Sequence, residues 1–256
     1  MTQVEEFYLL IQKKAKADFK KAEQIFTILA DLNGQFHAAF AQLEEAVEAK
    51  NSTLAQELLE VVRRISKELG DPMLEENVFS TEGIILYEQN NFQEAVSVFE
   101  NALEKAKKAN FHKAVVNAYM NIGECYYRLA NYDSSLKNFD IARGHAEERN
   151  DKHNLAIAQI NIAKVLCQNL KLGDVSSDVQ ATHYLTEAIE YFEKSGDKYN
   201  LMIAYGEFGD LEATKENYDS ALIYYERAAE IAQELNESVL HDFYYQKAQS
   251  MRNKLY

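Results

Sequence analysis

The chain has 256 residues, 47% of them hydrophobic, which is enough apolar surface for one large or two small folded domains. One proline and nine glycines favour long helices over sheets with tight turns, so the composition predicts an all-α protein. The formal net charge of −14 argues against nucleic acid as a partner, because a phosphate backbone would be repelled.

Residues 3–32 carry apolar side chains at helical spacing and predict an N-terminal amphipathic helix, which Asn33 and Gly34 end. Its five lysines are expected to form a solvated face, or alternatively a docking surface for an acidic partner. Acidic residues before a short apolar stretch are unlike a signal peptide, and no run reaches the roughly 18 apolar residues of a membrane helix. We therefore expect a cytoplasmic protein with no membrane partner.

Small residues recur farther along the chain at intervals of 40, 40, 46 and 40 residues. A second set follows each of them seven residues later, and a large apolar residue lies between the two. Pairs two turns apart on one helix face mark places where another helix approaches closely. The first set is Ala55, Ala95, Ser135, Ala181 and Ala221; the large residues are Leu59, Phe99, Phe139, Leu185 and Tyr225.

Two further features keep the same register. Phe92, Tyr132 and Tyr218 come three residues before the small residue, in phrases rich in Asn and acidic residues that make a turn and cap the second helix. Twelve residues before the small residue stands Gly83, Gly123 or Gly209, with Ala163 in the unit that is six residues longer. A recurring mid-helix glycine costs about 1 kcal/mol in propensity, so it indicates close helix contact.

This arrangement resembles the tetratricopeptide repeat signature over about residues 76–241. The units are 40 residues long rather than the common 34, similar to the solenoids of bacterial Rap-type peptide-sensing regulators. The resemblance implies a right-handed superhelical α-solenoid of about five helical hairpins, with an N-terminal helix and a C-terminal capping helix.

The expected parts follow one another along the chain. They are the N-terminal helix within residues 1–33, a degenerate first hairpin at 34–73, repeats at 76–115, 116–155, 156–201 and 202–240, and the capping helix at 241–256. The six extra residues of the 156–201 unit are expected near 171–178, as a longer loop between its helices.

No motif predicts chemistry. Cys125 and Cys167 are far apart and outside any CxxC pair, and we expect them to be core thiols. The six histidines follow no metal-ligand spacing, and no glycine-rich phosphate loop occurs. We therefore predict no catalytic residues, no metal site and no cofactor.

The candidate binding residues lie on the first helices of two repeats. Asn121 and Asn161 stand 40 residues apart, each two positions before the signature Gly or Ala. In tetratricopeptide receptors for short peptides, asparagines at this place hold the peptide backbone, and the resemblance implies the same here. A helix cap or an interhelical bond is the alternative. The other residues expected to line or border the concave groove are Asn117, Glu124, Tyr127, Arg128, Lys164 and Gln168.

These features predict a non-enzymatic scaffold that binds a protein or peptide segment. One alternative is a Rap-like regulator of a response regulator, although none of Gln12, Gln24, Gln35 and Gln42 is marked as catalytic. Another is a structural repeat protein that self-associates as a homo-oligomer. Capture of a chaperone C-terminus is disfavoured, because the lysine, asparagine and arginine that such a clamp requires are replaced by Ser80, Ile84, Ile157 and Asn161.

Overall fold

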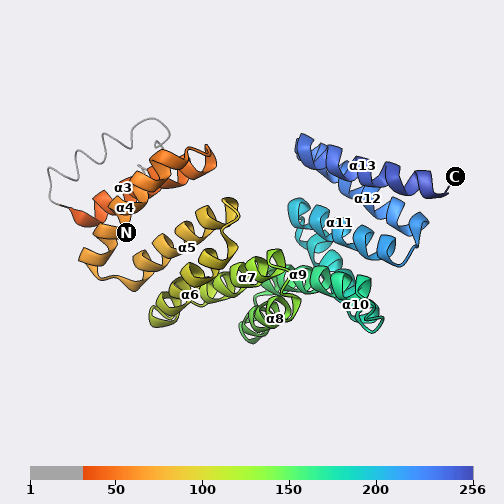
Figure 1. Cartoon of the computed structure of the whole chain (residues 1–256), viewed down its shortest axis with the longest axis horizontal. Coiled ribbons are helices and arrows are strands. Elements are labelled where there is room, and N and C mark those ends of the chain that lie inside the picture. The colour runs from red at the N-terminus through yellow and green to blue at the C-terminus, as the bar shows by residue number, and fades with distance from the viewer. Residues whose placement is uncertain (1–30, 256) are drawn as a thin grey trace. The chain divides into compact units, whose positions relative to one another are not determined.

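The computed structural model describes residues 31–255, which form eleven α-helices and no strand (Figure 1). The helix predicted over residues 3–32 lies outside the described residues, except at its last two positions. Its expected end differs from the structure, because Asn33 and Gly34 lie in the first turn of α3 (Leu32–Glu48). Asp31 caps this helix by accepting a hydrogen bond from the Gly34 N–H (3.1 Å).

The chain divides into two compact units, each a series of helical hairpins that follow one another along the chain as in an α-solenoid (Figure 1). The first unit ends at Ala118, within α7 (His112–Arg128), and the second begins at Tyr119. Before α7 the first unit contains α3, α4 (Ser52–Leu69), α5 (Pro72–Glu88) and α6 (Phe92–Lys108). After α7 the second contains α8 (Tyr132–Glu148), α9 (Lys152–Lys171), α10 (Ser177–Ser195), α11 (Lys198–Thr214), α12 (Tyr218–Glu234) and α13 (Ser238–Leu255).

Asparagine and aspartate start many of these helices. The cap side chain accepts a hydrogen bond from a backbone N–H two or three residues farther on, which satisfies one of the donors left over at a helix start. The residue before the cap has a positive φ in the turns at Lys50, Asn90, Ala130 and Asn150, among others. The capping residues include Asp31, Asn51, Asp71, Asn131, Asp151 and Asp197. This pattern recurs about every 20 residues and sets the length of each helix.

The recurrent glycines lie where an aromatic ring of the paired helix packs. A Cβ atom at Gly123 would lie 2.7 Å from the ring of Phe139, which is fully buried. The same relationship holds between Gly209 and Tyr225 in the second unit and between Gly83 and Phe99 in the first. The expected helix contact at these positions is therefore present, with the glycine making room for the ring.

Each unit has its own apolar core between its helices. In the first unit the most deeply buried large residues include Phe36, Leu43 and Val62, and in the second they include Phe192 and Met202. Cys125 and Cys167 are buried free thiols, as expected. Burial raises the pKa of Cys125 to about 12, so this thiol stays protonated at neutral pH.

The six extra residues of the hairpin formed by α9 and α10 are shared between its helices and its turn. α9 has 20 residues and α10 has 19, against 17 in each helix of the neighbouring hairpins, and the connection between them covers residues 172–176. The hairpins also begin before the units predicted from the small residues, at 72, 112 and 152 rather than 76, 116 and 156.

None of the helices within residues 31–255 is long and apolar enough to cross a membrane.

Candidate functional site

The repeat register of the second unit brings four polar residues to equivalent places on its first helices. Counting by the repeat intervals of 40, 46 and 40 residues, Asn121 on α7 corresponds to Asn161 on α9, Glu207 on α11 and Lys247 on α13. We call these four residues the 121 row. One helical turn later, Glu124, Lys164 and Asp210 correspond in the same way, and we call them the 124 row.

The two asparagines of the 121 row take little part in holding the fold together. The Asn121 side chain is partly buried and forms no hydrogen bond with any residue between 31 and 255. The Asn161 amide donates only to the Met120 sulfur, at 3.6 Å, and a thioether is a weak acceptor. The alternative expected from the sequence, a cap or an interhelical hydrogen bond, therefore applies to Asn161 only through this weak bond from α9 to α7, and the Asn121 side chain forms neither.

Four of the expected residues form one cluster between α7 and α9. Lys164 Nζ lies 2.5 Å from Glu124 Oε2 and 4.4 Å from the centre of the Tyr127 ring. Gln168 Nε2 donates to the Tyr127 phenol oxygen at 3.0 Å. Burial is the main reason why the pKa of Tyr127 rises to about 12, so the phenol remains neutral. The cluster combines an ion pair, a ring face and an amide on one surface.

Glu207 is the residue of this surface with the most unusual environment. Its side chain is partly buried and forms no hydrogen bond or ion pair within the described part of the chain. Burial raises its pKa to about 7, with smaller upward contributions from Asp210 and Glu124. The charges of Lys164 and Lys247 oppose this rise, which places both lysines close enough to act on the Glu207 carboxyl.

Lys247 and Asp210 form a second ion pair, between α13 and α11. Lys247 Nζ lies 2.7 and 2.8 Å from the two carboxylate oxygens of Asp210, and the Tyr225 phenol donates to the same carboxylate at 2.5 Å. Lys247 Nζ also lies 4.6 Å from the centre of the Phe243 ring. Asp210 is thereby satisfied on two sides, in contrast to Glu207.

Three further residues belong to this surface and were not expected from the sequence: Glu207, Asp210 and Lys247. The signal for them was available, because the repeat intervals that relate Asn121 to Asn161 lead on to Glu207 and Lys247. A comparison by residue type does not find them, because the asparagine at this position in the α7 and α9 repeats is replaced by glutamate and then by lysine. Of the remaining expected residues, Arg128 is exposed at the last position of α7, and Asn117 is exposed in the part of α7 that belongs to the first unit.

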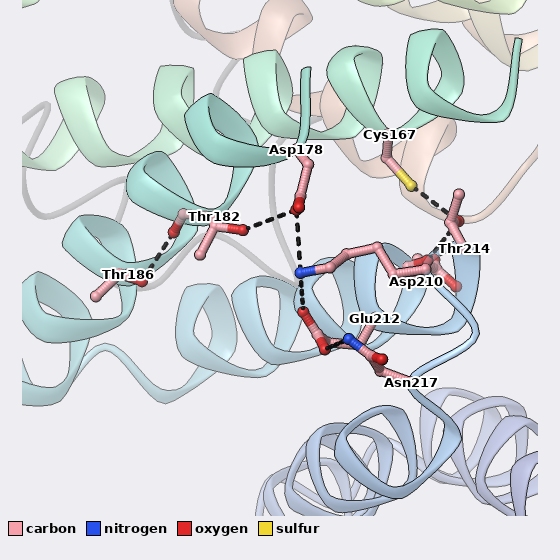
Figure 2. A network of polar contacts seen from close by, with 9 residues as sticks. Cys167, Asp178, Thr182, Thr186, Asp210, Glu212, Thr214 and Asn217 are labelled. Atoms are coloured by element: carbon pink, nitrogen blue, oxygen red, sulfur yellow. Dashed lines mark hydrogen bonds and ion pairs between the residues drawn. The ribbon is translucent and has the colours of Figure 1, made fainter. Parts of the chain in front are cut away.

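A second polar network near the C-terminal end of α11 is satisfied internally. Figure 2 shows Asp178, Glu212 and Asn217 in this network. Lys215 Nζ joins two of them, because it lies 3.0 Å from Asp178 Oδ1 and 2.9 Å from Glu212 Oε1. Asn217 donates to the other Glu212 oxygen at 2.9 Å. These bonds tie the start of α10 to the end of α11, so we assign this network to the fold rather than to binding.

Comparisons with known proteins agree with this architecture. Two family models match the chain, both described as tetratricopeptide repeat, one over residues 83–110 and the other over residues 203–235. The curated protein named tetratricopeptide repeat protein 29, from Trypanosoma brucei brucei, is 24% identical over 233 residues. That alignment covers 88% of this chain and 41% of the other, so the chain spans about two fifths of the relative's length.

Several solved structures have a similar fold. RapI in its apo form has a TM-score of 0.68 and 19% identity, over 79% of this chain and 72% of that one. The STAND protein with a tetratricopeptide repeat sensor from Pyrococcus horikoshii has a TM-score of 0.68 and 16% identity, over 95% and 40%. Aspartyl phosphate phosphatase F from Bacillus subtilis has a TM-score of 0.65 and 19% identity, over 91% of this chain and 64% of that one. At these identities the likeness concerns the fold alone.

Proposed function

Because this chain is a tetratricopeptide-repeat protein, we propose that it is a non-enzymatic scaffold that binds a protein or peptide segment on the first helices of its second unit. Such repeats stack their first helices along one concave surface, where side chains of successive units meet a partner. The proposed contacts are the residues expected from the sequence that lie in the second unit, with Glu207, Asp210 and Lys247 added. No cofactor is needed for this function.

The observation that supports the proposal is the state of Asn121 and Asn161. A carboxamide offers both donors and an acceptor, as a peptide bond does, and it can therefore hold an extended chain whatever side chains that chain carries. Asn121 has no partner within residues 31–255, and Asn161 has only a thioether. Both groups remain available to a ligand at repeat-related positions on adjacent first helices.

The test is capture of partners from the lysate of the native host by the wild type and by an Asn121→Ala, Asn161→Ala variant. A matched control is Asn101→Ala with Asn138→Ala, which changes the same residue type on the second helices α6 and α8. Circular dichroism first establishes that all three proteins are equally helical. We expect a partner that the wild type and the control retain and that the double variant loses. Equal capture by all three would contradict the proposal.

A second candidate is a sensory regulator that acts on a response regulator. The observation in its favour is the fold likeness to aspartyl phosphate phosphatase F over 91% of this chain. Gln35 and Gln42 lie on α3, where Gln42 Nε2 donates to the Ala38 carbonyl of its own helix (3.2 Å), and Gln12 and Gln24 lie outside the described residues. A phosphatase would shorten the lifetime of the aspartyl phosphate on a regulator, whereas a scaffold would leave that lifetime unchanged.

Self-association as a homo-oligomer is the remaining alternative. It predicts a molar mass that rises with protein concentration in light scattering, with no dependence on Asn121 or Asn161. A constant monomer mass would exclude it.

A further inference from the structure

The charges on the binding surface of the second unit do not balance. Glu124, Glu207 and Asp210 supply three carboxylates, and Lys164 and Lys247 supply two ammonium groups. Lys164 is paired with Glu124, and Lys247 is paired with Asp210. Glu207 is the carboxylate left without a partner of its own in the described part of the chain.

The Glu207 carboxylate forms no hydrogen bond or ion pair that would stabilise the fold within the described part of the chain. Partial burial of a charged group without a hydrogen bond costs free energy, and the raised pKa of Glu207 is a direct consequence of that cost. The equivalent positions on α7 and α9 carry asparagine, which is one methylene shorter than glutamate and has no charge. A neutral residue would therefore serve the packing of α11 better than Glu207 does.

The residues around Glu207 could contact the backbone and an apolar side chain of a peptide. Asn161 precedes it in the 121 row and offers a carboxamide to a peptide backbone. Ile203 lies one helical turn before Glu207 and is partly buried. Phe243 lies one turn before Lys247 and is 48% exposed. These two residues keep the same register on neighbouring first helices, so they offer an apolar contact next to the carboxylate.

From this we infer that Glu207 binds a cationic group of the partner segment, either a lysine or arginine side chain or a free N-terminal amine, next to an apolar residue that contacts Ile203 and Phe243. The inference rests on the proposed function and adds the chemical class of the ligand. A charge-assisted hydrogen bond to Glu207 would bring a third cation to three carboxylates and neutralise the cluster. It would also repay the cost of burying the Glu207 carboxylate.

The test uses a cellulose-bound array of randomised dodecapeptides, synthesised once with free and once with acetylated N-termini. The wild type, Glu207→Gln and Glu207→Lys are applied to both arrays after circular dichroism shows equal helicity. Glu230→Gln is the matched control, because it removes the same charge from an exposed position on the second helix α12. Peptides selected by the wild type are then made in soluble form, and fluorescence anisotropy measures their affinity for each protein.

We expect the wild type and Glu230→Gln to select peptides with lysine, arginine or a free amine, and Glu207→Gln to bind the same peptides about tenfold more weakly or worse. Glu207→Lys should shift the selection to acidic peptides. The acetylated array separates the two cation sources, because only an N-terminal amine is lost by acetylation. Selection of peptides without any cationic preference, or an unchanged preference in Glu207→Gln, would overturn the inference alone. If the wild type bound no peptide on either array, the proposed function would fail with it.

Discussion

Lys247 and Asp210 join the last helix of the second unit to α11 through two short contacts, at 2.7 and 2.8 Å between the ammonium nitrogen and the two carboxylate oxygens. The Lys247 side chain is 29% exposed and that of Asp210 is 31% exposed, so solvent screens the pair only in part. The pair therefore stabilises the position of α13 and also lies on the proposed binding surface.

Replacement of Lys247 by methionine should loosen α13. The change keeps a side chain of similar length and leaves Asp210 with the Tyr225 hydrogen bond alone, so we expect a loss of about 1 kcal/mol, reduced by solvent screening. Amide hydrogen exchange in α13 should accelerate about fivefold, the factor that corresponds to this free energy. Lys194→Met removes an exposed ion pair on α10 and should change exchange very little. Equal effects of the two variants would refute a special role for the Lys247 pair.

Alanine at Gly123 should destabilise the second unit. Its Cβ atom would lie 2.7 Å from the fully buried Phe139 ring, so we expect a loss of about 1–3 kcal/mol in the free energy of unfolding. Gly144→Ala is the matched control, because that glycine also lies within a helix but has no atom within 4 Å of the added Cβ. It should gain about 0.5–1 kcal/mol from helix propensity. Urea denaturation followed by circular dichroism measures both, and opposite signs are the expected result.

Glycine at Ala130 should stabilise the turn between α7 and α8. Ala130 has a φ of 55°, in the left-handed region that side chains with a Cβ atom rarely adopt. Removing the Cβ atom there should raise the free energy of unfolding by about 0.5–1 kcal/mol. Ala109→Gly changes the C-cap of α6, where φ is −78°, and should instead destabilise the protein by a similar amount. A melting temperature that falls in both variants would show that no strain is stored at Ala130.

The titration of Glu207 should make stability depend on pH. The pKa is about 7 in the folded chain against an ordinary value of 4.5, so between these values the unfolded chain loses this proton first. Stability should therefore fall as pH rises from 4.5 to 7, by at most about 3 kcal/mol, and remain lower above pH 7. Below pH 4.5 Glu207 is protonated in both the folded and the unfolded chain, and the folded chain has its full stability relative to pH values above 7.

Glu207→Gln isolates this effect from the other titrating groups. The difference in the free energy of unfolding between this variant and the wild type should be larger at pH 8 than at pH 5, in favour of the variant. Urea denaturation of both proteins at pH 5 and pH 8 measures the four free energies of unfolding that this comparison needs. A difference that is the same at both pH values would show that Glu207 titrates normally.

The repeat register explains how much of the fold could be predicted. The glycine-to-aromatic relationship at Gly123 and Phe139 follows from residue spacing, because a missing side chain at a fixed distance from a large one indicates one packing contact. The start of α3 was harder to place. Asn33 and Gly34 are typical of a helix end, but Asp31 supplies the hydrogen bond that starts the helix before them.

Part of the candidate site could be predicted for the same reason. Asn121 and Asn161 are identical residues at one repeat interval, whereas Glu207 and Lys247 keep the position and change the chemistry. The six extra residues before Glu207 also hide the relationship from a fixed 40-residue comparison. The pairing of Lys247 with Asp210 depends on how far a lysine side chain reaches across two helices, which spacing along the sequence does not contain.

The connection between α9 and α10 has a practical consequence. This hairpin has already absorbed six residues, and the register of Glu207 and Lys247 is recovered beyond it. Gly173 has open space around it, and the nearby Leu172 and Val175 are 75% and 78% exposed. A fluorophore or a short affinity tag inserted after Gly173 would therefore lie in an exposed connection and interrupt no helix.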